Sequence, residues 1–190
     1  MFPDFGEKYI IRIIDGFLDN YILKTCPLIH IYYDPSAKIK NAVQIASKAG
    51  YLETVKALYA KGHNIRENID NAVVISAREG KVNVLKFLVS KGCNPRTQND
   101  KAFCLACENG HLSVIDYLLS QGVDVQTCNN EPICIASKYG HLNVVKYLCD
   151  NDANIKARNC MPIGLASENG HLDVVQFLRS KRSSLVTRSN

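Results

Sequence analysis

The chain has 190 residues and a mass of 21.2 kDa, and its 46% apolar and 22% charged content is ordinary for one domain with its own core. Its 23 basic and 18 acidic residues give a formal charge of +5, which is far from the dense basic clusters that would favour nucleic-acid binding. Charged and polar residues interrupt its most apolar early stretch, residues 10–22, unlike a signal peptide or membrane span, so we expect a soluble intracellular protein, in the cytoplasm or the nucleus.

Residues 1–40 contain one amphipathic stretch and do not repeat cleanly. Ile10, Ile14 and Phe17 fall on one helical face, before Pro27 interrupts the pattern. We expect a helical cap or a degenerate repeat over this segment, and the pattern leaves both alternatives open.

A 30-residue period then runs through residues 41–180. Its first mark is a glycine column, which consists of Gly50, Gly80, Gly110, Gly140 and Gly170. Apolar columns follow two, five and eight residues after each glycine, and a spacing of three predicts one face of a helix. A second apolar stripe, with a column of small residues, precedes each glycine. The predicted repeats are 41–70, 71–100, 101–130, 131–160 and 161–180, each with two short helices that bury their apolar faces by stacking.

The glycines are expected to serve the turns. A left-handed backbone between the two helices costs residues other than glycine about 1–2 kcal/mol. Gly62, Gly92 and Gly122 are expected to end the second helices in the same way. Replacing Gly110 with Val should therefore destabilise the middle of the stack, whereas Arg96→Ala should leave melting nearly unchanged.

The chain ends in a polar segment. After Leu178 the sequence continues Arg-Ser-Lys-Arg-Ser-Ser. We expect residues 181–190 to be a basic tail that frays from the solvated end of the stack.

The repeats resemble the ankyrin family, whose units carry Thr-Pro-Leu-His-x-Ala, then Gly-His, then an apolar second helix. The best matches are residues 106–119, which contain Glu-Asn-Gly-His-Leu, and residues 162–178. The resemblance implies an all-α solenoid of stacked helix-turn-helix repeats. The family's usual period is about 33 residues, so we expect hairpin connectors three residues shorter than usual. Thirty-residue units of this type are similar to the ankyrin families of giant DNA viruses, which makes the chain a candidate for interaction with host proteins.

The eight cysteines mostly occupy repeat columns that hold Ala, Ser, Val or Leu elsewhere, which favours reduced thiols. Cys104 and Cys107, followed by Cys128 and Cys134, look like a loose zinc pattern. However, Cys104 and Cys134 share one column and should lie about 10 Å apart, too far for a disulfide or a common metal. We expect no metal and no cofactor, and Cys128, in a connector, as the most reactive thiol.

The sequence does not favour an enzyme. His111, His141 and His171 follow the repeat glycines in a column that also holds Tyr51 and Lys81, which indicates a turn role. No histidine, serine or cysteine has a recurring base or carboxylate that would form a triad, and the glycines do not form a phosphate loop.

Two varied columns, in the connectors and at the ends of the first helices, supply the candidate partner-binding residues. These are Lys48, Arg66, Arg78, Arg96, Gln126, Lys138, Tyr139, Lys156 and Arg158. A merely solvated face would vary in the same way, so both interpretations stay open. Arg66, Arg96, Lys156 and Arg158 are expected to form a basic strip about 30 Å long. Tyr139 is the best anchor candidate.

We therefore predict a monomeric, non-catalytic scaffold that binds another protein, of acidic character, on a concave face made by the hairpins and first helices. The alternative is nucleic-acid binding through the basic strip, which would weaken steeply with salt. An enzyme and a metal-binding thiol cluster are the remaining, weaker hypotheses.

Overall fold

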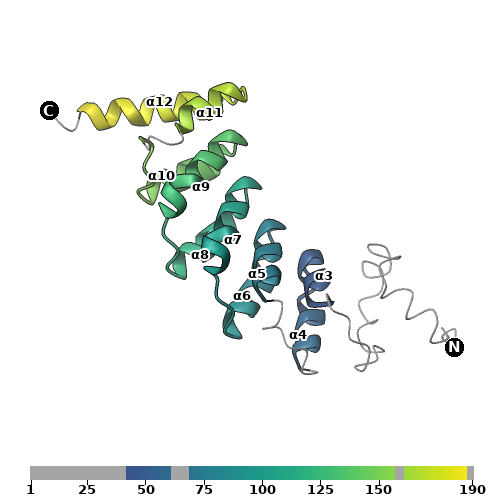
Figure 1. The fold of residues 1–190 in the computed structure, drawn as a ribbon. Coiled ribbons are helices and arrows are strands. Elements are labelled where there is room, and N and C mark those ends of the chain that lie inside the picture. Colours follow the sequence, from purple (N-terminus) through teal and green to yellow (C-terminus); the bar gives the residue numbers. More distant parts are fainter. Residues whose placement is uncertain (1–41, 61–68, 157–160, 188–190) are drawn as a thin grey trace.

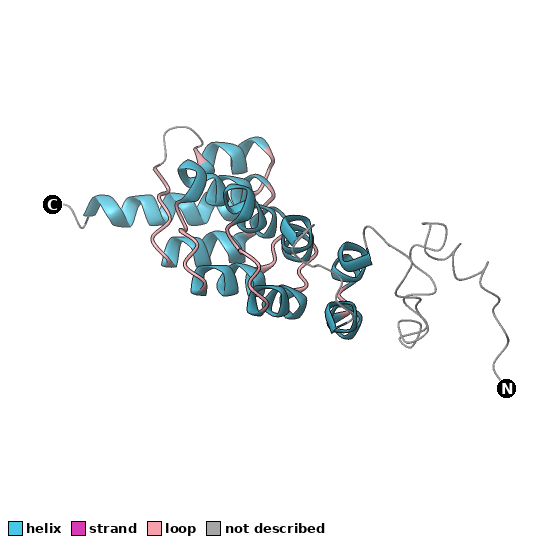
Figure 2. Cartoon of the chain, turned by 60° about the horizontal axis from the view of Figure 1, so that its bottom comes forward, coloured by secondary structure: helices cyan, strands magenta, loops and turns pink. Residues whose placement is uncertain are grey.

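The computed structural model describes residues 42–60, 69–156 and 161–187, and within these ranges every regular element is a helix (Figures 1 and 2). The helices are α3 (Ala42–Ala49), α4 (Leu52–Ala60), α5 (Ile69–Arg78), α6 (Val82–Ser90), α7 (Thr97–Glu108), α8 (Leu112–Ser120), α9 (Thr127–Lys138), α10 (Leu142–Asp150), α11 (Pro162–Glu168) and α12 (Leu172–Thr187). The all-α solenoid predicted from the 30-residue period is confirmed. The cap or degenerate repeat expected over residues 1–40 lies outside the described residues.

The odd-numbered helices stack into one layer and the even-numbered helices into a second (Figure 1). Neighbouring first helices pack more closely than neighbouring second helices do. The small-residue column permits this approach, and all its members are buried: Ala46, Ser76, Ala106, Ala136 and Ala166. Because the first-helix layer is the more tightly spaced one, the stack curves toward it, and this layer forms the inner side.

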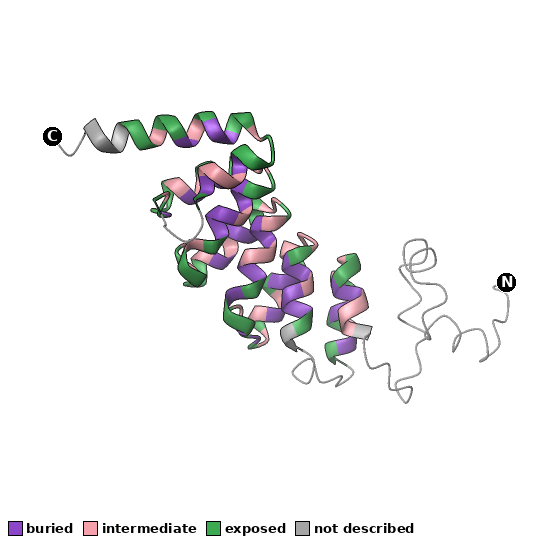
Figure 3. Ribbon diagram, turned by 45° about the horizontal axis from the view of Figure 1, so that its top comes forward, coloured by how far each residue is buried: buried purple, intermediate pink, exposed green. Residues whose placement is uncertain are grey.

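The core runs between the two layers as a continuous stripe (Figure 3). The apolar columns five and eight residues after each glycine are buried, and they comprise Val55, Leu58, Leu85, Leu88, Ile115, Leu118, Val145, Leu148, Val175 and Leu178. Burying one such side chain contributes about 1.5–3 kcal/mol. No repeat can bury both of its helices alone, so each depends on its neighbours.

The central glycines adopt the predicted left-handed conformation, with φ between +69° and +82°. The histidines that follow Gly110, Gly140 and Gly170 reach back to the preceding repeat. His111 Nε2 donates to the carbonyl oxygen of Arg78 at 2.8 Å, His141 Nε2 to that of Glu108 at 2.7 Å and His171 Nε2 to that of Lys138 at 2.9 Å. The histidines therefore cap the ends of the first helices, as the turn interpretation requires.

The second helices also end at a repeated position, where the backbone turns left-handed. Gly92 and Gly122 have φ of +88° and +83°, and Asp152 takes the same left-handed conformation at +65°. The next member of the column is Arg182, which lacks this tendency, and α12 continues past it to Thr187. Residues 181–187 are therefore helical, where the sequence suggested a fraying tail.

Ser137 offers a test of packing between the first helices. Its hydroxyl oxygen is buried and has no hydrogen-bond partner in the structure, whereas the column also accommodates Ala77. We expect Ser137→Ala to raise the free energy of unfolding by about 1 kcal/mol, and the melting temperature by about 2–4 °C, because an unpaired buried hydroxyl is removed. Thermal unfolding followed by circular dichroism measures this, and a lower melting temperature would mean that the hydroxyl has a partner.

Candidate binding surface and its connector network

Each described connector starts with the same local turn. An Asn or Asp side-chain oxygen accepts the backbone N–H two residues later, in an Asx turn that fixes the chain direction. The acceptor and donor residues, each pair at 2.9 Å, are Asn94 and Arg96, Asp124 and Gln126, and Asn154 and Lys156. The side chains of residues 96, 126 and 156 are therefore exposed at equivalent places. This Asn/Asp column is visible in the sequence, although none of the predictions above rests on it.

A left-handed turn of three residues follows, just inside the N-terminal ends of α7 and α9. Residues 98–100 have φ between +54° and +58°, and residues 128–130 have φ between +50° and +67°. Four of these six residues are Asn or Asp, the types other than glycine that tolerate this conformation best. The short connectors are thus compact turns, and the regular part of each first helix begins only after them.

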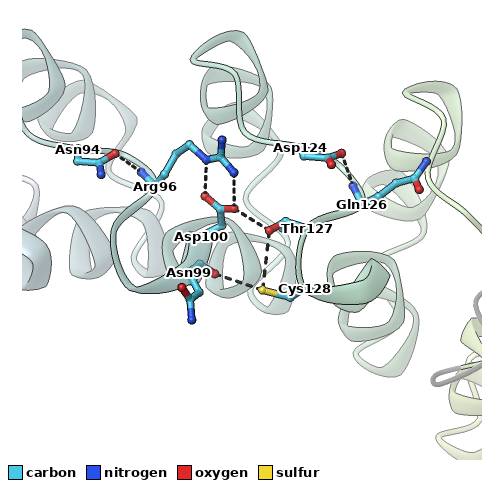
Figure 4. A network of polar contacts seen from close by, with 8 residues as sticks. All are labelled: Asn94, Arg96, Asn99, Asp100, Asp124, Gln126, Thr127 and Cys128. Carbon is cyan, nitrogen blue, oxygen red and sulfur yellow. Dashed lines mark hydrogen bonds and ion pairs between the residues drawn. The ribbon is translucent and has the colours of Figure 1, made fainter.

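The connector before α7 is tied to the connector before α9 through a buried carboxylate (Figure 4). Arg96 donates from Nε to Asp100 Oδ1 at 3.0 Å and from its terminal guanidinium nitrogen to Oδ2 at 3.2 Å. Thr127 Oγ1, from the next repeat, donates to Asp100 Oδ2 at 2.6 Å. Cys128 Sγ donates to the carbonyl oxygen of Asn99 at 3.2 Å. These contacts fix the register of two neighbouring repeats at their connector edge.

The Asp100 carboxylate is ionised, because the contacts that stabilise its negative charge outweigh the cost of burying that charge. Burial alone would raise the pKa of Asp100, but hydrogen bonds from Arg96 and Thr127, with the positive charge of Arg96, together lower it below its ordinary value. The Asp100 side chain is only 5% exposed and the Arg96 side chain 51%. Arg96→Ala would leave this carboxylate without its cation, so we now expect it to lower the melting temperature, in place of the nearly unchanged melting inferred from sequence.

The described candidate residues are all exposed, but the structure places them in two rows. Arg96, Gln126 and Lys156 lie in the connectors, and Lys48, Arg78, Lys138 and Tyr139 lie beside the glycine turns, at the opposite ends of the first helices. A helix of eight residues is about 12 Å long, so this is roughly the separation of the two rows. Arg66 and Arg158 lie outside the described residues, so the expected basic strip can be followed only through Arg96 and Lys156.

Tyr139 presents its ring at the end of α9, with 44% of the residue exposed. Lys138 Nζ lies 5.4 Å from the ring centroid. The Glu108 carboxylate of the preceding repeat, as a hydrogen-bond acceptor and through its negative charge, raises the pKa of Tyr139. An exposed aromatic ring with a cation beside it suits an anchor.

Among the described cysteines, Cys134 differs from the expectation of reduced thiols. Cys93, Cys104, Cys107, Cys128 and Cys149 are free, as predicted, but Cys134 is disulfide-bonded. Cys104 and Cys134, at equivalent positions of adjacent repeats, were not expected to pair with each other, and Cys104 is free. Pairing with a cysteine elsewhere needs only two Cβ atoms about 4 Å apart, which a comparison of columns does not address.

The free thiols also differ in environment. Burial, with the neighbouring Cys128 thiol and the negative charges of Glu131 and Asp100, raises the pKa of Cys104 to about 12. Cys128 is exposed, which agrees with its choice as the most reactive thiol, although reactivity itself stays a prediction. Among the described residues, the group with metal-ligand chemistry is Cys104, Cys128 and Glu131, whose ligand atoms lie within 4.8 Å of one another. Two of the four cysteines of the zinc-like sequence pattern, Cys104 and Cys128, belong to this group, whereas Cys107 and Cys134 do not.

Comparison with known families agrees with the geometry. A family model of ankyrin repeats, in three copies, matches residues 42–129 and 103–189, which is more than half of the chain. No curated protein matches the chain significantly. In the described part of the chain, no helix combines the length and apolar character needed to cross a bilayer.

Proposed function

We propose that this chain, which belongs to the ankyrin repeat family, is a non-catalytic scaffold that binds one protein partner along its connectors and first helices. Ankyrin repeats are generally protein–protein interaction modules, and the family is typically non-catalytic. We further propose that it acts as a monomer inside the cell. Its 30-residue units support an origin among the ankyrin proteins of giant DNA viruses, in which case the partner would be a host protein.

The observation that carries the proposal is the rigid, repeated presentation of exposed side chains. Three equivalent Asx turns hold Arg96, Gln126 and Lys156. Further bonds between connectors lock the row, because Gln126 Nε2 donates to the carbonyl oxygen of Asp152 at 2.9 Å and Asn154 N donates to Asn130 Oδ1 at 3.3 Å. A connector backbone that is ordered before binding loses little entropy when a partner docks, which favours affinity.

The charge of the surface supports an acidic partner. Arg96 is paired with Asp100, and a guanidinium nitrogen of Arg78 lies 3.0 Å from Glu79 Oε1. Part of the positive charge of both arginines is therefore compensated within the chain. Lys48, Lys138 and Lys156 are exposed. Basic residues in both rows, with Lys138 beside the Tyr139 ring, would steer and orient an acidic protein surface. Compensation at Arg96 weakens the alternative of nucleic-acid binding, which depends on several free cations.

The test is affinity capture from cell extract with three chains. The surface variant carries Lys48→Ala, Lys138→Ala and Lys156→Ala, and the control variant carries Lys56→Ala, Lys86→Ala and Lys146→Ala, on the exposed side of the second-helix layer. Both variants lose three positive charges, so net charge does not distinguish them. We expect the parent and the control to capture the same protein after the extract is treated with nuclease. The surface variant should lose most of this protein.

Equal capture by all three folded chains would place the binding face elsewhere. Loss in both variants alike would show a non-specific charge effect. Capture that depends on nucleic acid would favour the alternative function.

A further inference from the structure

We propose that Cys104, Cys128 and Glu131 form a binding site for a thiophilic divalent cation of the zinc class, placed between two neighbouring repeats. The Sγ atoms of the two cysteines and a carboxylate oxygen of Glu131 lie within 4.8 Å of one another. A zinc ion with bonds of about 2.0–2.3 Å to such ligands needs separations of nearly 4 Å, so small side-chain rotations suffice.

The three ligands come from different places in the chain. Cys104 lies in the first helix of one repeat, within α7, and is half-buried. Cys128 belongs to the left-handed turn of the next connector, and Glu131 opens the regular part of α9 directly after that turn. The positive φ of residues 128–130 folds the connector back toward α7, which brings Cys128 and Glu131 to the same point. A bound ion would therefore join the two repeats.

The chemistry of the ligands selects the cation. Two sulfur ligands and one carboxylate suit zinc or cadmium, whereas magnesium and calcium prefer oxygen ligands alone. Both thiols bind as thiolates, so binding of one ion releases two protons, and the ion's two charges offset those of the two sulfurs. Both oxygens of Asp100, the other carboxylate of this network, are engaged by Arg96 and Thr127. Water would fill the fourth position.

The site is accessible and locally supported. Cys128 and Glu131 are exposed, which provides an entry path for the ion. Thr127 Oγ1 lies 3.8 Å from Cys128 Sγ and is itself fixed by Asp100. The cluster differs from the cysteine pattern considered in the sequence, because Cys107 is fully buried and Cys134 is disulfide-bonded.

Titration of the full-length chain with Co²⁺ under an oxygen-free atmosphere, without a reductant that would open the disulfide of Cys134, tests the site. Cobalt bound by thiolates gives a sulfur-to-metal charge-transfer absorption that cobalt bound by oxygen lacks. We compare the parent with Cys128→Ser and Glu131→Gln, and with the control Cys149→Ser, which removes a half-buried thiol outside the cluster. Circular dichroism confirms that each variant is folded.

We expect one Co²⁺ per parent chain with charge-transfer absorption. Cys128→Ser should lose this absorption and bind at least about tenfold more weakly, Glu131→Gln should bind several-fold more weakly, and Cys149→Ser should match the parent. Added Zn²⁺ should raise the melting temperature of the parent and of Cys149→Ser, but not of Cys128→Ser. Absence of the absorption in the parent, or unchanged cobalt affinity and absorption in a folded Cys128→Ser, would overturn the proposal.

Discussion

Replacing Gly110 with valine is expected to lower the free energy of unfolding by about 3 kcal/mol, and the melting temperature by about 6–12 °C. Gly110 has φ of +72°, where a β-branched residue is strained. A Cβ atom at this position would lie 2.8 Å from Nδ1 of His141. The ring would have to move, and its 2.7 Å hydrogen bond to the Glu108 carbonyl oxygen would be lost.

Gly122→Val is the matched control for this substitution. Gly122 has a similar φ of +83°, but a Cβ atom there would meet nothing within 4 Å. Its valine variant should show the backbone cost alone, so Gly110→Val should be more destabilising by about 1 kcal/mol, the contribution of the histidine contact. Urea denaturation measures both variants. Equal losses of stability would contradict a structural role for the contact of His141 with the Gly110 turn.

Asp100→Asn is expected to lower the free energy of unfolding by about 1–2 kcal/mol at neutral pH, after allowance for solvent screening at the half-exposed Arg96. Asparagine tolerates the left-handed backbone of this position, whose φ is +58°. The substitution removes the negative charge that accepts hydrogen bonds from Arg96 and Thr127. The loss therefore reports the charged network rather than a change of backbone conformation.

The same pair of proteins should show a defined pH dependence. The pKa of Asp100 in the folded chain is lowered, from about 3.9 for the unfolded residue. Its contribution is therefore fully present above about pH 4 and is lost as pH falls through the folded-state pKa. Denaturation at several pH values should show the parent's advantage over Asp100→Asn shrinking on acidification. A constant advantage down to about pH 3, below the unfolded pKa, would show that the ionised carboxylate is not the stabilising group.

The helices and glycine turns could be predicted because their causes are local and repeated. A spacing of three in the apolar columns defines a helical face, and a left-handed turn strongly favours glycine, as at Gly110. The continuation of α12 was missed although its cause is visible, since Arg182 replaces the residue that ends the other second helices.

The connectors could not be derived in the same way. Their left-handed residues include Gln98 and Cys128, which are not glycine and carry no strong preference for this conformation. The contact of Thr127 with Asp100 joins residues 27 apart and follows from how adjacent repeats dock. The varied columns indicated the exposed positions, but not the ion pair of Arg96 with Asp100. Nor did they indicate that Cys104, Cys128 and Glu131 lie close together.

The central claim is that one protein binds across the connector and glycine-turn rows, and its most direct test is a dissociation constant. Calorimetric titration of the purified captured partner into each chain should give binding at least about tenfold weaker for the variant at Lys48, Lys138 and Lys156. The control variant at Lys56, Lys86 and Lys146 should bind as the parent does. An unchanged constant for the first variant, or an equal loss in both, would contradict the claim.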